Sequence, residues 1–241
     1  NDELESFNNI VSHDMQEPLR KIQMFISRIE ADEVKKLSPT AQGYFDRISF
    51  SANRMQNLMI DLVNYSQSVK GEKIFEKVEL ANLVSKVVGM LPLEIEEHKV
   101  KIEIGNLPEI IGLPFQLQQL FLNLLSNSIK FGKEEETNFI RIFQEEILDF
   151  DIKDSLQLSA AEYFKVVIED TGIGFEQQFA TKIFKLFSTL KKNSQQKGTG
   201  IGLAICKRVM DNHNGFIFAR GKTNQGSRFI LYFPKNLRTH N

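Results

Sequence analysis

The sequence predicts an α+β protein in two parts: an N-terminal helical hairpin, followed by an α/β sandwich with one layer of helices on a mixed sheet. Apolar residues recur at helical spacing up to about residue 70, whereas short strand-like runs alternate with helices beyond it. The polar sequence Lys70-Gly71-Glu72-Lys73 separates the two patterns. We therefore expect one domain at residues 1–70 and a second at 71–241.

The composition is that of an ordinary globular protein. Hydrophobic residues make up 41% and charged residues 25%, and the formal net charge is −1, so no strong charge favours nucleic acid or a membrane surface. A single cysteine, Cys206, excludes an intramolecular disulfide and fits a reducing, cytoplasmic compartment. The first residue is Asn1 rather than methionine, so we expect a fragment whose sensor or membrane anchor would lie upstream.

The first segment, residues 1 to about 31, is predicted to form an amphipathic helix. His13 projects away from its apolar stripe and is expected to be exposed, which by itself is usual for a solvated histidine. Pro18 removes a backbone donor and crowds the carbonyl of Asp14, so the helix should bend one turn after His13. The stripe consists of Leu4, Phe7, Val11, Met15, Pro18, Ile22, Phe25 and Ile29.

A second helix is predicted after a short polar break at residues 31–38. Ser38 is placed to cap it and Pro39 to occupy its first turn. Its apolar residues follow a 4-3 spacing at Ala41, Phe45, Ile48, Ala52, Met55, Met59, Leu62, Ser66 and Val69. Such heptads indicate coiled-coil packing, and a two-fold dimer forming a four-helix bundle would cover the stripe that one hairpin leaves in water. Alternatively, both helices pack on the following domain.

The second part alternates strands and helices, as in an α/β sandwich. Strands are predicted at residues 75–78, 100–104, 109–111, 141–147, 164–169, 216–219 and 228–233, and helices at 80–90, 115–131 and 200–212. The polar segment at residues 151–161 is expected to be a loop or a hairpin tip.

Three polar clusters in this second part could form one site. Asn123, Asn127 and Lys130 share one face of a strongly apolar helix, where such groups are costly unless they meet a ligand or a metal-bound phosphate. The sequence Asp170-x-Gly172-x-Gly174 follows a predicted strand, so its carboxylate could accept from the amino edge of a flat ligand. The glycine-rich sequence 198–203 opens a helix, whose N-terminus favours an anion. Each cluster alone also fits a simple polar face or turn.

The order and separation of the clusters resemble those of one family. Asn-x-x-x-Asn-x-x-Lys-Phe, Asp-x-Gly-x-Gly and Gly-x-Gly-x-Gly-Leu, with Ile183-Phe184-Lys185-Leu186-Phe187 before the last, resemble the N, G1, G2 and F boxes of the sensor histidine kinases of two-component signalling. That family's ATP-binding fold is shared with gyrase, Hsp90 and MutL. The segment Ser12-His13-Asp14-Met15-Gln16-Glu17-Pro18-Leu19 resembles its H box in phytochrome-like form, so the resemblance covers essentially the whole chain.

The resemblance implies a role for each matching position. Asp170 would bind the adenine amino group, Asn127 would coordinate Mg²⁺ between phosphates, and Lys130 would reach the phosphates. Asn123 lies nearby, and both Asn123 and Lys130 are expected to be catalytic, because phosphoryl transfer depends on positioning and charge neutralisation. The remaining nucleotide-binding positions would be Phe131, Gly172, Gly174, Phe187, Gly198, Thr199, Gly200, Gly202 and Leu203.

The resemblance makes His13 the phosphoacceptor, with Asp14 as the carboxylate that orients the imidazole and takes its proton. It implies an ATP-dependent protein-histidine kinase that uses ATP and Mg²⁺, works as a homodimer, and passes its phosphoryl group to an aspartate of a response regulator receiver domain. We expect a cytoplasmic core with no nucleic-acid partner, which reaches a membrane only through regions absent from this chain.

Two other functions are compatible with the same residues. An ATP-hydrolysing conformational switch of the same fold typically has a glutamate where this chain has Asn123, which disfavours hydrolysis. A dimeric scaffold could instead bind nucleotide without transferring phosphate.

The chain also departs from the family pattern. Glu17 stands where Thr or Asn often supports dephosphorylation of the partner, which disfavours phosphatase activity. The arginine that often follows the F box is replaced around Thr189, so Lys191 or Lys192 is expected to meet the γ-phosphate from a polar lid at residues 188–197. The remaining histidines lack metal-ligand spacing and are expected to be structural or surface residues: His98, His213 and His240.

Overall fold

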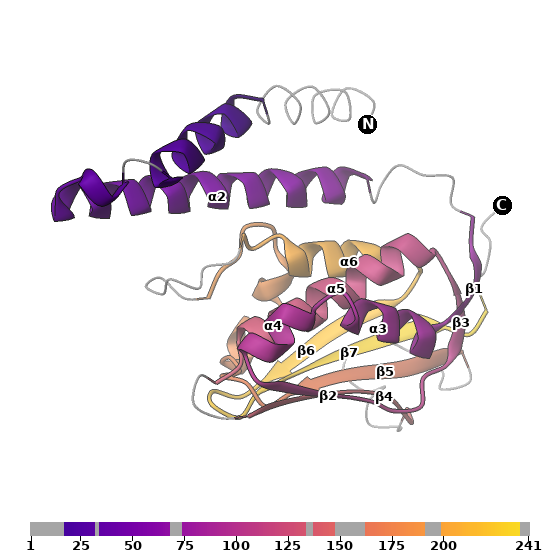
Figure 1. Cartoon of the computed structure of the whole chain (residues 1–241). Coiled ribbons are helices and arrows are strands. Elements are labelled where there is room, and N and C mark those ends of the chain that lie inside the picture. The colour runs from indigo at the N-terminus through magenta and orange to yellow at the C-terminus, as the bar shows by residue number, and fades with distance from the viewer. Residues whose placement is uncertain are drawn as a thin grey trace. The chain divides into compact units, whose positions relative to one another are not determined.

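The computed structural model divides the chain into two compact units, Asn1–Gly71 and Glu72–Asn241. Figure 1 shows the helices of the first unit and the sheet and helices of the second. The residues that the structure describes are 17–31, 34–67, 74–133, 137–147, 162–190 and 199–236. None of the helices in these ranges is both long enough and apolar enough to cross a membrane.

The first unit is a helical hairpin. Residues 17–31 are helical, a single turn follows at η1 (Val34–Lys36), and the long helix α2 spans Pro39–Gln67. The predicted start of α2 is confirmed, and Ser38 caps it by accepting the backbone N–H of Ala41 on Oγ at 3.3 Å. The turn is held by Gln42, whose Nε2 donates to the carbonyl of Val34 at 3.0 Å.

The core of the hairpin uses every seventh residue of each helix. Leu19 and Ile26 of the first helix pack with Phe45, Ala52 and Met59 of α2. On α2 these residues are every second one of the predicted heptad positions. On the first helix the prediction was wrong, because neither Leu19 nor Ile26 belongs to the predicted stripe.

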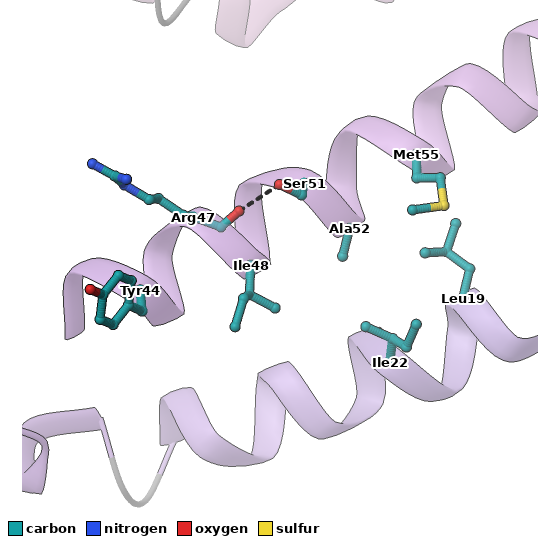
Figure 2. A pocket seen from close by; sticks show the side chains of 8 residues that line it. All are labelled: Leu19, Ile22, Tyr44, Arg47, Ile48, Ser51, Ala52 and Met55. Atoms are coloured by element: carbon teal, nitrogen blue, oxygen red, sulfur yellow. Dashed lines mark hydrogen bonds between the residues drawn. The ribbon is translucent and has the colours of Figure 1, made fainter. Parts of the chain in front are cut away.

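The next positions of the predicted stripes remain exposed, as the sequence predicts for one hairpin alone. Ile22, Phe25 and Ile29 are exposed on the first helix, and Ile48 and Met55 are exposed on α2. Figure 2 shows that side chains of both helices line an apolar groove beside the hairpin core. This groove has a volume of about 510 Å³ and is lined by Leu19, Ile22, Tyr44, Arg47, Ile48, Ser51, Ala52 and Met55.

The other edge of the hairpin interface is polar. Gln23 Nε2 donates to Asn53 Oδ1 at 3.2 Å, and Ser49 Oγ donates to Glu30 Oε1 at 3.3 Å. Around the axis of α2, the buried residues lie between two groups. Ser49 and Asn53 are on one side of them, and Ile48 and Met55 are on the other. One edge of the hairpin is therefore closed by hydrogen bonds, while the groove edge is apolar.

The second unit is a mixed α/β sandwich, as predicted. Its strands are β1 (Glu76–Glu79), β2 (Val100–Ile104), β3 (Glu109–Gly112), β4 (Asn138–Glu145), β5 (Tyr163–Asp170), β6 (Phe216–Gly221) and β7 (Ser227–Pro234). Its helices are α3 (Leu80–Val88), α4 (Pro92–Glu97), α5 (Pro114–Lys130) and α6 (Gly202–Asn212), with single turns η3 (Gln177–Phe179) and η4 (Lys182–Phe184). Among these, α4 and the two single turns were not predicted, because elements this short show no measurable periodicity.

Five strands form one sheet in the order β2-β4-β5-β7-β6, and β1 pairs with β3 in a separate ribbon. The β2–β4 pair is parallel and the other pairs are antiparallel. The helices α3 to α6 cover one face of the five-stranded sheet (Figure 1). The core between them contains fully buried residues of α5 and of the facing strands: Leu117, Leu120, Phe121, Leu124, Leu125, Ile140, Ile142, Val166, Ile168 and Leu231.

The opposite face of the sheet carries a group of ion pairs. Lys165 on β5 is buried and its Nζ lies 2.7 Å from Glu145 Oε2 on β4. Arg228 on β7 also pairs with Glu145, and its Nε lies 3.6 Å from Glu169 Oε2. Glu145 therefore forms ion pairs with two cationic side chains, one on β5 and one on β7.

Candidate functional site

The polar residues of α5 lie along one side of the C-terminal half of that helix. Asn123 and Asn127 are half-buried, and Lys130 is the last helical residue. Among the groups that the structure describes, the buried Nδ2 of Asn123 has no hydrogen-bond partner. An unsatisfied buried donor costs about 1–3 kcal/mol, so this amide fits a site that receives an acceptor from a ligand.

The beginning of α6 lies against this part of α5. A Cβ atom added to Gly202 would lie 3.3 Å from Asn123 Oδ1, so a larger residue would crowd the amide. The first backbone N–H groups of α6 have no partners within the helix and point towards its N-terminal end. The structure thus brings the predicted Asn123 and Gly202 together, with helix-end donors beside an unsatisfied amide.

Asp170, at the end of β5, is buried on the helix-covered side of the sheet, in phase with Val166 and Ile168. Its Oδ1 accepts the backbone N–H of Gly172 at 2.9 Å and that of Ser227 at 3.2 Å. Its Oδ2 accepts the hydroxyl of Ser128 at 3.3 Å and a short hydrogen bond from the hydroxyl of Ser227.

Burial raises the pKa of Asp170 above its ordinary value, and the hydrogen bonds offset this only in part. A carboxylate held in this way by fixed donors is oriented before any ligand arrives. Neither Ser128 nor Ser227 was among the predicted site residues. The contact of Ser227 depends on the β5–β7 register, in which Asp170 pairs with Ser227, and no local sequence signal reveals that register.

The loop after β5 is pressed against the end of α5 and the β6–β7 turn. Ile173 donates its N–H to the carbonyl of Phe131 at 2.9 Å, and a Cβ at Gly172 would lie 2.4 Å from that same oxygen. Gly174 has φ +60°, and its Cβ would lie 2.2 Å from the carbonyl oxygen of Lys222. These glycines therefore permit close approach of other parts of the chain.

The segment before α6 packs on the predicted F box. Phe187 has φ +60°, a strained conformation for a bulky residue, and its ring is largely exposed. Gly200 has φ +76°, and a Cβ there would lie 2.8 Å from the carbonyl carbon of Phe187. Thr199 Oγ1 accepts the N–H of Ile201 at 3.4 Å, and Leu203 is half-buried in the first turn of α6. The helix begins two residues later than predicted because Gly200 adopts this non-helical conformation.

Lys130 and Phe131 lie together at the end of α5, with Lys130 Nζ 5.8 Å from the centre of the Phe131 ring. The structure therefore arranges the predicted residues around the C-terminal half of α5, between the loop after β5 and the start of α6. The predicted site residues and histidines that lie outside the described part of the chain are His13, Asp14, Lys191, Lys192, Gly198 and His240. The same holds for Leu4, Phe7, Val11, Met15 and Val69 of the predicted stripes and for the predicted loop at residues 151–161.

The chemistry of the donor set restricts how a metal ion could be held. Within the described ranges, no three His, Cys, Asp or Glu side chains form a group that could hold a metal ion. Cys206 is buried, and burial raises the pKa of its thiol far above its ordinary value. The carboxamide of Asn127 fits a hard cation that takes most of its oxygen ligands from phosphates and water.

Two family models match the chain. The model described as histidine kinase-, DNA gyrase B- and HSP90-like ATPase matches residues 112–237. The model described as the His Kinase A (phospho-acceptor) domain matches residues 3–71. The two matches thus include the described site and the helical hairpin.

Individual proteins are also similar to the chain. The phytochrome-like protein Cph1 of Synechocystis sp. is 30% identical over 234 residues, which cover 97% of this chain and 29% of Cph1. The chain therefore spans less than a third of the length of that relative. Full-length ShkA in complex with AMPPNP has a TM-score of 0.64 at 20% identity, covering 96% of this chain and 46% of that one. ThkA in complex with the response regulator protein TrrA has a TM-score of 0.60 at 22% identity, covering 96% and 61%.

Proposed function

We propose that this chain transfers the γ-phosphoryl group of ATP to His13 and then to an aspartate of a response regulator, because it belongs to the sensor histidine kinases of two-component systems. The observation that carries this proposal is the buried, pre-oriented carboxylate of Asp170, on the side of the sheet covered by α5. The names of the relatives support the same reaction, since ShkA was crystallised with AMPPNP and ThkA with a response regulator.

The base and phosphates of ATP would be held by different parts of the site. Asp170 would accept a hydrogen bond from the exocyclic amine of adenine, which places the base between the loop after β5 and the end of α5. Lys130, the amide of Asn123 and the backbone donors at the start of α6 would meet the phosphate oxygens. Asn127 would hold Mg²⁺ together with phosphate oxygens, and the ion would supply neutralisation of the phosphate charge.

At the acceptor, a neutral imidazole nitrogen of His13 would attack the γ-phosphorus. The bond between phosphorus and the β,γ-bridging oxygen breaks, and ADP leaves. Asp14 would orient the ring through its other nitrogen and take the proton that the ring gives up. The same nitrogen–phosphorus bond then breaks when an aspartate of the response regulator accepts the phosphoryl group.

The helical hairpin would act as a homodimer. Its apolar groove, with Ile22 and Ile48 in the lining, lies along one edge, while hydrogen bonds close the other edge. A second copy related by a two-fold axis would place identical apolar edges together and form a four-helix bundle. The exposed apolar residues that the hairpin alone leaves in water support this arrangement.

Incubation with γ-labelled ATP and Mg²⁺ tests the kinase activity. We expect label on the protein that is acid-labile and alkali-stable, as a nitrogen–phosphorus bond requires, and we expect His13→Gln to abolish it. His98→Gln is the matched control and should keep the label. Steady release of phosphate without labelling of the protein would instead indicate an ATP-hydrolysing switch.

A further inference from the structure

The carboxylate of Asp170 already accepts hydrogen bonds from the protein before a ligand binds. An ionised carboxylate has about four lone-pair positions. All four are used in the structure, two by backbone N–H groups on Oδ1 and two by serine hydroxyls on Oδ2. An amino group that donates to this carboxylate must therefore replace one of the existing donors.

The backbone donors are fixed. Gly172 N–H belongs to the tight loop that is pressed on Phe131, and Ser227 N–H belongs to β7, which is paired with β5 along its whole length. The replaceable donors are therefore the hydroxyls on Oδ2, because a hydroxyl rotates about its own bond.

Of the two hydroxyls, that of Ser128 is the more weakly held. Its distance to Oδ2 is 3.3 Å, near the limit for an O–H···O hydrogen bond, whereas Ser227 makes a short contact. Ser128 is also in the last turns of α5, where a serine hydroxyl can turn to the carbonyl four residues earlier, that of Leu124. Buried Ser128 therefore has a second acceptor available without leaving its helix.

We propose that Ser128 sets the affinity and base selectivity of the site: its hydroxyl donates to Asp170 in the empty site and gives up that position to the exocyclic amine of an aminopurine. This inference rests on the proposed adenine pocket at Asp170. Binding of an aminopurine then costs one existing hydrogen bond, which lowers its affinity. A purine without the amine leaves the Ser128 bond in place.

The test compares ATP with purine riboside 5′-triphosphate, which lacks the 6-amino group, by calorimetry on the full chain. Ser128→Ala should tighten ATP binding roughly three- to ten-fold, the size expected for one hydrogen bond of ordinary strength, because the 3.3 Å contact of Ser128 is long. Binding of purine riboside triphosphate should stay within about two-fold. Ser126→Ala, which alters a neighbouring serine of the same helix, is the matched control and should change neither affinity.

The outcomes separate this inference from the proposed function. A change of the same size for both nucleotides, weaker ATP binding, or no change in Ser128→Ala would overturn the role of Ser128. Selective tightening in Ser227→Ala instead of Ser128→Ala would also overturn it. If Asp170→Asn leaves ATP affinity unchanged, the adenine pocket itself is misplaced, whereas a loss in that variant keeps the pocket whatever Ser128 does.

Discussion

His213 accepts the backbone N–H of Leu113 on Nε2 at 2.9 Å, across 100 residues of sequence. Its Nδ1 lies 2.7 Å from the carbonyl oxygen of Val209, so the ring is neutral with its proton on Nδ1. The imidazole is only 1% exposed. It therefore joins the end of α6 to the beginning of α5, the two helices that frame the candidate site. The expectation that His213 is structural or on the surface is met by its structural role.

Replacement of His213 should loosen this connection. In His213→Ala the buried N–H of Leu113 loses its acceptor, which costs about 1–3 kcal/mol, and a cavity forms beside it. Hydrogen exchange followed by mass spectrometry should show faster exchange at the Leu113 amide than in the unaltered chain. His98→Ala, at the more exposed end of α4, is the control. Unchanged protection at Leu113 would show that the imidazole does not hold this helix start.

Asp170→Asn should weaken ATP binding. The variant keeps the shape of the side chain, but its NH2 group would occupy the Oδ2 position, where serine hydroxyls can accept, and would meet the adenine amine donor to donor. Loss of a charge-assisted hydrogen bond corresponds to roughly ten- to hundred-fold weaker binding. Calorimetric titration with ATP measures it, with Asp211→Asn on the exposed face of α6 as the control. Equal affinity in both variants would contradict the adenine pocket.

A charge in the hairpin groove should separate the proposed dimer. Ile48 and Phe50 are similarly exposed on α2, at 55% and 49%, but only Ile48 lines the groove. Ile48→Glu would bury two carboxylates at the interface, so light scattering should show the mass of a single chain. Phe50→Glu should keep twice that mass. If both variants behave alike, the second copy does not sit on this groove.

The stability of the second unit should depend on pH through Glu145. Burial alone would raise the pKa of the Glu145 carboxyl, but hydrogen bonds and charges from Lys165 and Arg228 hold that pKa below its ordinary value. Because the folded pKa is lowered, the stabilisation is present above the ordinary value of 4.5 and is lost as the pH falls through the folded pKa.

Glu145→Gln removes this dependence, since glutamine does not titrate. Urea unfolding at several pH values should show a less stable variant near neutrality, which loses less stability than the unaltered chain between about pH 5 and pH 3. Glu103→Gln, at a more exposed ion pair with Arg141, is the control. Parallel curves for the Glu145 variant and the unaltered chain would contradict the assignment.

The sequence predicted those features that depend on local chemistry. Ser38 and Pro39 mark the start of α2, and the apolar face of α5 has a clear helical period, so both elements were predicted within one residue at their starts. The polar residues Asn123 and Asn127 were visible for the same reason, since they interrupt that apolar pattern.

Other features depend on partners far away in the chain. Periodicity placed Ile22 on the apolar stripe, but it could not show that Leu19 would be the position that faces α2. Ser227 lies 57 residues from Asp170, and their contact depends on strand register. Ser128 was adjacent to a predicted residue, yet its importance appears only when the end of β5 is brought beneath α5.

The late position of β7 in the chain determines when the hydrogen bonds of the site can form. It is the last strand that the structure describes, it joins β6 to β5, and it carries Ser227, which supplies two of the hydrogen bonds of Asp170. During synthesis, Asp170 would leave the ribosome well before these donors exist. A chain truncated before β7 would have an unpaired edge at β5 and a poorly held carboxylate. Premature termination should therefore produce a target for proteolysis rather than a partly active protein.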